Sequence, residues 1–241
     1  MNGSLNGKTI LITGAARRLG RLFGLACARA GADIVIHHGH SDADAESLHQ
    51  EITEMGRKAS VIKADLTDSS QARELIPQIN ESTPVHALVN SAAIFESLSL
   101  ETTSIKDWER HIAVNQTAPF LLSQAFAKRA PADARIVNIL DWRALRPGAD
   151  HFPYTISKAG LAALTKSLAV ALAPGITVNG LALGAVLPPA DRDVNPEITR
   201  SIPAKRWSKE KEVEEALLFL LGGPAYITGE ILHVDGGRHL V

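Results

Sequence analysis

The sequence contains one cysteine, no long apolar run and almost no net charge. Because Cys27 is the only cysteine among 241 residues, no disulfide can form within the chain, and we expect a reducing compartment. No apolar run approaches the ~18 residues that a membrane-spanning helix needs, and the first strand-like run is too short for a secretion signal. The net charge of −1 gives no global attraction to nucleic acid or anionic lipid. We therefore expect a soluble, cytoplasmic protein that binds neither nucleic acid nor membranes.

Internal repeats, low-complexity tracts and linkers are also missing, and short apolar segments alternate with helix-like ones. Strands are expected over residues 8–13, 33–37, 59–64, 85–90, 134–140, 176–182 and 230–235. Helices are expected over residues 18–30, 42–56, 69–79, 105–129, 153–173 and 210–222. This alternation predicts a Rossmann-type α/β fold, in which a doubly wound parallel sheet of about seven strands has helices on both faces. One domain over residues 1–241 accommodates it.

One stretch, residues 184–209, is broken by four prolines and fits no regular element throughout. In doubly wound sheets, ligands bind beyond the carboxyl ends of the strands. We therefore predict that this stretch is a loop that covers a substrate.

The first strand leads into a helix through a glycine-containing turn. Gly14 can adopt backbone angles that are closed to other residues, and Gly20 lets the helix approach the strand closely. The N–H groups at the helix start would face a pyrophosphate. The middle glycine of such turns is missing, because Arg18 stands there, either in solvent or beside the cofactor phosphates or substrate. The nucleotide-binding residues predicted at this turn are Gly14, Arg17, Arg18, Leu19 and Gly20.

The end of the second strand lacks the acidic residue that would bind a ribose 2′-hydroxyl and repel a 2′-phosphate. Residues 37–41 read His-His-Gly-His-Ser, and the first acid is Asp42. His40 and Ser41 could donate hydrogen bonds to a phosphate, whereas we expect Asp42 and Asp44 to begin a helix. Three histidines in four residues also fit a metal site, but neutral loop histidines are commoner and no metal is predicted. The predicted cofactor is NADP(H), held here by His38, His40 and Ser41.

Polar and small residues follow the next two strands. The Asp65 carboxylate could reach an adenine amino group, and the small residues Ser91 and Ala92 would let a flat ring lie against the backbone. Turn capping is the alternative for Asp65 and Asn90. The remaining cofactor-binding residues predicted are Asp65, Leu66, Asn90, Ser91, Ala92, Tyr154, Lys158 and Gly184.

Tyr154 and Lys158 are four residues apart on one predicted helix and so project from the same face. An ammonium group beside a phenol lowers the pKa of the phenol, which makes it a better proton donor and acceptor near neutral pH. Together with the nucleotide-binding turn, this pair predicts an oxidoreductase.

The motifs occur in the order found in the short-chain dehydrogenases/reductases, which the chain resembles over nearly its whole length. The residues that carry this resemblance are residues 13–20, Asp65, residues 90–92, Asn115, Tyr154, Lys158 and residues 179–184. Within the family, the chain is most similar to the pteridine reductases and the related bacterial dihydromonapterin and dihydrofolate reductases. Four details carry this closer resemblance: the turn sequence around Arg18, the histidine-rich second strand end, Asp141 where most members have serine, and Phe95. Three departures are Gly39-His40 in place of His-Arg, Leu183 in place of proline, and Asn90-Ser91-Ala92 in place of Asn-Asn-Ala or Asn-Ala-Gly.

The resemblance implies the roles of several residues. It implies that Lys158 binds the nicotinamide ribose, that Asn115 holds a water in a proton relay, and that Tyr154 donates a proton to the substrate. It further implies that Phe95 and the nicotinamide enclose a pterin ring, with Arg18 at the polar edge of that ring. Plain core filling is the alternative for Phe95. Family members are usually tetramers or dimers built on the helices near 105–129 and 153–173, so a homo-oligomer is expected.

Asp141 distinguishes between classes of substrate. An ionised carboxylate would oppose the alkoxide that forms when a ketone is reduced. Reduction of a C=N bond instead yields a nitrogen that needs a proton, which a carboxylic acid can supply. Asp141 therefore favours imine-type substrates such as a dihydropterin ring, unless it merely caps the loop after the fifth strand.

The leading prediction is an NADPH-dependent reductase of dihydrobiopterin, dihydromonapterin or dihydrofolate, in which Asp141, Tyr154, Lys158 and Asn115 form the catalytic group. The substrate residues are Arg18, Phe95, Asp141 and Tyr154. One alternative keeps the fold but reduces a ketone or a 3-oxoacyl thioester. A more distant alternative binds NADP(H) as a sensor without turnover.

Overall fold

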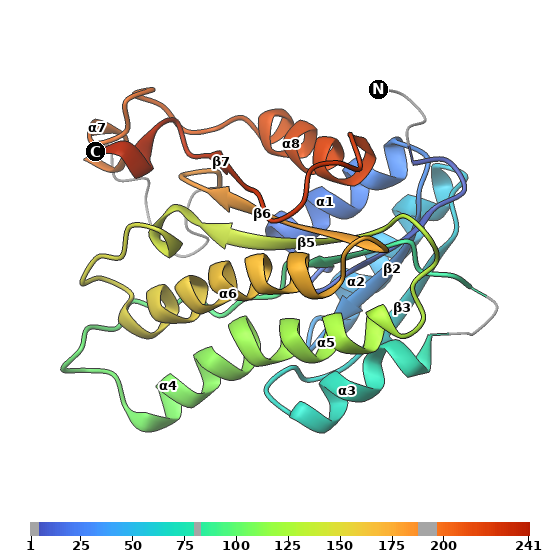
Figure 1. Cartoon of the computed structure of the whole chain (residues 1–241), viewed down its shortest axis with the longest axis horizontal. Helices are drawn as coiled ribbons and strands as arrows, with labels where there is room; N and C mark the ends of the chain where they lie inside the picture. Colours follow the sequence, from blue (N-terminus) through green and yellow to red (C-terminus); the bar gives the residue numbers. More distant parts are fainter. Residues whose placement is uncertain (1–4, 80–82, 188–196) are drawn as a thin grey trace.

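The computed structural model describes residues 5–79, 83–187 and 197–241, which form a parallel sheet with helices on both faces (Figure 1). The seven strands lie in the order β3-β2-β1-β4-β5-β6-β7. This arrangement confirms the predicted doubly wound Rossmann-type sheet. The strands are β1 (Thr9–Ile12), β2 (Asp33–His38), β3 (Ala59–Lys63), β4 (Ala87–Asn90), β5 (Ala134–Asp141), β6 (Ile176–Leu183) and β7 (Ile231–Val234).

Helices cover both faces because the central strands are apolar on both sides. In β1, Ile10 and Ile12 join the core on one face of the sheet, and Leu11 joins the core on the other. The helices are α1 (Arg18–Arg29), α2 (Asp42–Glu54), α3 (Ser69–Gln78), α4 (Ile105–Ile112), α5 (Ala118–Ala127), α6 (Phe152–Ala171), α7 (Glu197–Arg200) and α8 (Glu210–Gly222). Helices α1, α2 and α8 lie on the first face, and α3 to α6 lie on the second (Figure 1).

The helix predicted over residues 105–129 is divided by a π-helical turn, η1 (Ala113–Thr117). The Ala118 N–H donates to the Ala113 carbonyl, five residues back. Pro119 has no N–H and cannot bond the Asn115 carbonyl four residues earlier, so it disfavours regular α-helix at this point. Single π turns inside helices often mark functional sites.

The chain also contains two short 3₁₀ turns, η2 (Trp142–Ala144) and η3 (Arg238–Leu240). Of the loop predicted over residues 184–209, residues 188–196 lie outside the described residues, and the remainder includes the short helix α7. In the described part of the chain, no helix combines the length and the apolar character needed to cross a membrane.

Candidate active site

The turn after β1 packs backbone against backbone. Gly14 has φ +64°, and a Cβ added there would lie 2.9 Å from the Cα of Ala92. A Cβ on Gly20 would overlap the Gly14 carbonyl oxygen. Both glycines are therefore required by close approach, as expected from the sequence. Arg18 occupies the position of the missing glycine with φ +50°, in the left-handed region that glycine favours.

The hydroxyl of Thr13 joins this turn to the segment after β4. Its Oγ1 accepts hydrogen bonds from the backbone N–H groups of Ser91 and Ala92, at 2.9 and 3.0 Å. These bonds fix the backbone on which a flat ring was expected to lie. Leu19, also predicted near the cofactor, packs partly buried against the core.

His37, which sequence reasoning did not assign to the site, supports the same turn. Its Nδ1 accepts from the Gly14 N–H at 3.1 Å, so Nε2 carries the proton and donates to the Ala64 carbonyl at 3.0 Å. Burial is the main cause that lowers the pKa of His37 to about 4. His37 is therefore a neutral brace between the ends of β1 and β3.

Charged side chains surround the end of β2. Asp42 and Asp44 begin α2, as predicted; Asp42 pairs with Lys63 at 2.7 Å, and Asp44 pairs with Arg17 at 2.6 Å. His38 is buried, and its Nδ1 has no hydrogen-bond partner among the described residues. Within those residues, no group of three or more histidines, cysteines or acids is placed to hold a metal ion.

The polar residues after β3 and β4 have different environments. The Asp65 carboxylate accepts from the N–H and hydroxyl of Thr67, at 2.9 and 2.8 Å, which lowers its pKa and makes it a turn cap. The buried side chain of Asn90 donates through Nδ2 to the side-chain Oδ1 of Asn138 at 2.8 Å. Its own Oδ1 is buried with no partner in the described part of the chain, so it remains available as an acceptor.

Tyr154 and Lys158 lie together at the end of β5, both buried. The Tyr154 hydroxyl donates to Oδ2 of Asp141 at 3.2 Å, and the Lys158 Nζ donates to the Ile139 carbonyl at 2.7 Å. Burial, with the Asp141 charge second, raises the pKa of Tyr154 well above its usual value, whereas burial lowers the pKa of Lys158 to about 8.

The expectation that Lys158 lowers the pKa of Tyr154 is therefore wrong for the chain's own groups. The Lys158 Nζ lies 5.8 Å from the centre of the phenol ring and bonds a backbone carbonyl instead. The result is a phenol that keeps its proton at neutral pH.

Asn115, in the π turn η1, joins three parts of the site. Its Nδ2 donates to the Ile94 carbonyl and to the Ser157 hydroxyl, each at 3.0 Å, and its Oδ1 accepts from the Ile94 N–H at 2.8 Å. Both amide hydrogens are used within the protein. The side chain thus positions the segment before Phe95 and the helix that carries Lys158.

Asp141 both caps a turn and faces Tyr154. Its Oδ1 accepts from the Arg143 N–H at 2.8 Å and caps η2, while the other oxygen of the carboxylate contacts Tyr154. The Arg143 guanidinium lies 3.5 Å from the same Oδ1 and 2.6 Å from Asp150. Sequence reasoning missed Arg143, which is nearly buried.

Phe95 lies beside Tyr154 and is 55% exposed. Its ring is edge-on to Tyr154, with centroids 4.7 Å apart, and is stacked on His151 at 4.1 Å. The core-filling alternative for Phe95 is therefore wrong, because the ring presents an open face next to the proton donor.

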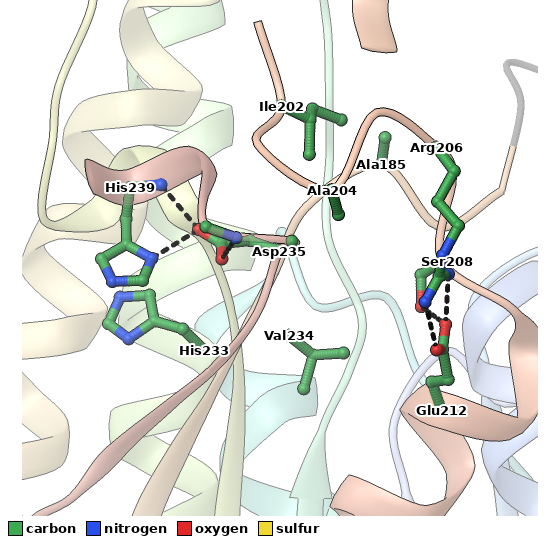
Figure 2. A pocket seen from close by; sticks show the side chains of 12 residues that line it. Ala185, Ile202, Ala204, Arg206, Ser208, Glu212, His233, Val234, Asp235 and His239 are labelled. Atoms are coloured by element: carbon green, nitrogen blue, oxygen red, sulfur yellow. Dashed lines mark hydrogen bonds and ion pairs between the residues drawn. The ribbon is translucent and has the colours of Figure 1, made fainter. Parts of the chain in front are cut away.

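Beyond β6 and β7, a cavity of about 370 Å³ opens between the segment over residues 202–208 and the end of the chain (Figure 2). Gly184 lies at its margin, where an added Cβ would be 2.7 Å from the Cα of Asp235. Figure 2 shows His233 stacked against His239, whose ring centroids are 3.9 Å apart. Nearby, the ring of Trp142 contacts two arginines: the Cζ atoms of Arg143 and Arg238 lie 4.7 and 4.4 Å from its centre.

Comparison with known proteins places the chain among oxidoreductases. A family model described as enoyl-(acyl carrier protein) reductase matches residues 14–239. A 3-oxoacyl-[acyl-carrier-protein] reductase from Synechocystis sp. is 31% identical, over 97% of this chain and 98% of the relative. The blue fluorescent protein from a metagenomic library, in complex with NADPH, is 35% identical with a TM-score of 0.91, over 98% of this chain and 99% of that one. FolM alternative dihydrofolate reductase 1 from Brucella suis, in complex with NADP, is 32% identical with a TM-score of 0.89. The match covers 97% of this chain and 96% of that one.

A doubly wound parallel sheet with a phosphate-type turn after β1 and a tyrosine–lysine pair at the end of β5 defines an α/β oxidoreductase. The chain belongs to the short-chain dehydrogenase/reductase family. The solved relatives bind NADP or NADPH, which is the cofactor that the sequence predicted.

Proposed function

We propose that this chain is an NADPH-dependent reductase of dihydropterin-type substrates. The observation that carries the proposal is the contact between Tyr154 and Asp141 beside the exposed ring of Phe95. This arrangement places a phenol, the carboxylate that accepts its hydrogen bond and one flat apolar surface at a single point. FolM from Brucella suis, a similar structure, is named as a dihydrofolate reductase.

The described residues fit a dinucleotide. The backbone at Gly14 lies so close to that of Ala92 that no side chain fits between them. A turn without a side chain at this position lets the backbone approach a ligand closely. The orphaned Oδ1 of Asn90 and Nδ1 of His38 are buried polar atoms at the ends of β4 and β2, the two strands that flank β1. The residues that would hold the cofactor are Gly14, Arg17, Arg18, Leu19, Gly20, His38, His40, Ser41, Asp65, Leu66, Asn90, Ser91, Ala92, Tyr154, Lys158 and Gly184.

When bound, NADPH supplies a hydride to the carbon of a C=N bond. The nitrogen of that bond then needs one proton, and Tyr154 carries one, because its raised pKa keeps the phenol protonated at neutral pH and well above it. Asp141 shares that proton through Oδ2, while the Arg143 N–H holds Oδ1 in place. Lys158 fixes the end of β5, and Asn115 keeps Phe95 and Lys158 in register.

Phe95 provides one wall for a flat substrate. Its stacking on His151 holds the ring in place, and its open face fits a pterin better than an aliphatic chain. Arg18, at the start of α1, is proposed for the polar edge of that ring.

The competing function is reduction of a 3-oxoacyl thioester, the activity in the name of the Synechocystis relative. The carboxylate of Asp141 disfavours this reaction, because a negative charge 3.2 Å from the phenol oxygen opposes a developing alkoxide.

The deciding experiment follows NADPH oxidation by the purified protein with dihydrobiopterin, dihydrofolate and an acetoacetyl thioester side by side. Turnover of the pterins with little turnover of the thioester supports the proposal. Turnover of the thioester alone overturns it and assigns Asp141 to the loop after β5.

We further propose that the active species is a homo-oligomer. Apolar side chains remain exposed on α5 and α6, among them Phe120 and Val170, which is 82% exposed. Light scattering of the purified protein measures the assembly, and a monomer would overturn this part.

A further inference from the structure

We infer that Arg238 binds a carboxylate of the substrate, so that dihydrofolate-type substrates with an acidic tail are preferred over pterins with neutral side chains. This inference rests on the proposed function and names the substrate class within it. It starts from the end of the chain, which no motif assigned to the site.

Arg238 is held in a fixed segment. The buried carboxylate of Asp235 accepts from the Gly237 N–H at 2.9 Å, and from the N–H and Nδ1 of His239, each at 2.8 Å (Figure 2). These bonds anchor η3 on both sides of Arg238. The guanidinium therefore loses little conformational entropy when it meets a ligand.

The anchored segment reaches the active site through Trp142. The Cζ of Arg238 lies 4.4 Å from the centre of the Trp142 ring, and Trp142 directly follows Asp141. Asp141 in turn contacts the hydroxyl of Tyr154. Arg238 is thus connected, through one side chain, to the residue that touches the proton donor.

Arg238 forms no direct ion pair with a carboxylate in the described part of the chain. Arg143, the other cation on Trp142, pairs with Asp150 at 2.6 Å and lies 3.5 Å from Asp141. The Arg238 guanidinium makes no hydrogen bond or ion pair within residues 5–79, 83–187 and 197–241. Burial, and next the neighbouring charge of Arg143, lower its pKa, and the charges of Asp141, Asp150 and Asp235 offset this only in part.

An unpaired, partly desolvated guanidinium on a rigid segment is suited to bidentate binding of a carboxylate. In the binding mode that we infer, the pterin ring lies against Phe95 and the side chain of the substrate points toward Arg238. The side chains of dihydrobiopterin and dihydromonapterin carry hydroxyl groups, whereas that of dihydrofolate ends in two carboxylates. Of these substrates, only the folate offers the anion that Arg238 lacks.

The test measures kcat and KM of wild type, Arg238→Gln and Arg238→Lys for dihydrofolate and for dihydrobiopterin, together with the KM for NADPH. We expect Arg238→Gln to lower the ratio of kcat/KM for dihydrofolate over dihydrobiopterin by about tenfold, mainly through KM, with partial recovery in Arg238→Lys. Added salt should weaken the wild-type preference more than that of Arg238→Gln.

Lys211→Gln is the matched control, because it removes one exposed cation from α8, where Lys211 pairs only loosely with Glu215 at 3.8 Å. In Lys211→Gln, the ratio of kcat/KM for dihydrofolate over dihydrobiopterin should equal that of wild type. An unchanged ratio in Arg238→Gln overturns the inference and leaves the pterin assignment standing. A changed KM for NADPH with an unchanged ratio would instead place a cofactor phosphate at Arg238. If wild type reduces neither pterin, the proposed function fails and this inference with it.

Discussion

The hydroxyl of Tyr154 donates to Oδ2 of Asp141 at 3.2 Å, and this contact joins the ionisation of the phenol to the choice of substrate that we propose. The charge of Asp141 is the second cause, after burial, of the raised pKa of Tyr154. Replacement of Asp141 therefore changes two measurable properties of the enzyme.

We expect Asp141→Ser to lose dihydropterin reduction more than ketone reduction, because a serine hydroxyl can stabilise an alkoxide but is a poor source of a proton. The pKa of Tyr154 should fall in this variant, so activity that needs the protonated phenol should decline at lower pH than in wild type. The measurement is the pH profile of kcat/KM with each substrate.

Asp150→Ser is the control for this variant, since it removes a carboxylate that bonds Arg143 and does not contact Tyr154. In Asp150→Ser, the pH at which kcat/KM declines on the alkaline side should stay close to that of wild type. Equal loss of pterin and ketone turnover in Asp141→Ser would contradict the role assigned to the carboxylate.

Burial of the charged Lys158 side chain lowers the stability of the folded chain by an amount that depends on pH. The pKa of Lys158 falls from 10.5 to about 8 on burial, so the unfolded chain binds more protons than the folded one between these values, and stability rises with pH across that window. Below pH 8 the full cost is present, of the order of 3 kcal/mol before its bond to Ile139 offsets part of it. We therefore expect Lys158→Met to be more stable than wild type at pH 7, although it loses activity.

Urea unfolding at pH 7 and at pH 9.5 measures this effect. The advantage of Lys158→Met should shrink at the higher pH, because the wild-type lysine is then largely neutral when folded. A gap that stays constant between the two pH values would show that packing, rather than ionisation, causes the difference.

Much of the fold could be predicted from the sequence because buried parallel strands leave a clear pattern. Ile10, Leu11 and Ile12 are apolar on both faces, and the polar residues that follow such strands meet at one edge of the sheet. Asp141 was singled out in this way, and Tyr154 and Lys158 were singled out by their spacing on one helix. The division of the helix at Asn115 was missed, although Pro119 four residues later was a usable signal.

Other parts of the site could not be predicted because they depend on contacts between distant residues. Trp142 and Arg238 are far apart in the chain, and no local pattern predicts that they touch. The role of His37 depends on the register of β1 with β2, which places its ring beside Gly14. The direction of the Tyr154 pKa shift was wrong because the spacing of Tyr154 and Lys158 does not reveal that Lys158 bonds a carbonyl of β5.

His37 should be needed for cofactor binding as well as for stability. His37→Leu leaves the Gly14 N–H and the Ala64 carbonyl without partners in a buried place, which we expect to cost about 1–3 kcal/mol in the free energy of unfolding. Because Gly14 belongs to the phosphate-binding turn, the Kd for NADPH should rise as well. Fluorescence titration with NADPH and urea unfolding measure the two effects.

His86 provides a matched control at the opposite end of β1. Its Nδ1 accepts from the Thr9 N–H at 3.0 Å, the same kind of bond that His37 makes to Gly14. His86→Leu should lose stability and keep the wild-type Kd for NADPH. A Kd that is unchanged in both variants would restrict His37 to a structural role.

Phe95 should contribute to substrate binding and little to stability. Its ring is 55% exposed, so Phe95→Ala should change the free energy of unfolding by less than about 1 kcal/mol. Loss of a stacking wall should raise the KM for dihydropterins by about tenfold. Phe126→Ala is the contrasting variant, because Phe126 is fully buried and its loss should cost about 3–5 kcal/mol. Thermal unfolding and the KM for dihydrobiopterin separate the two effects. A large loss of stability in Phe95→Ala with an unchanged KM would show that the ring is part of the core.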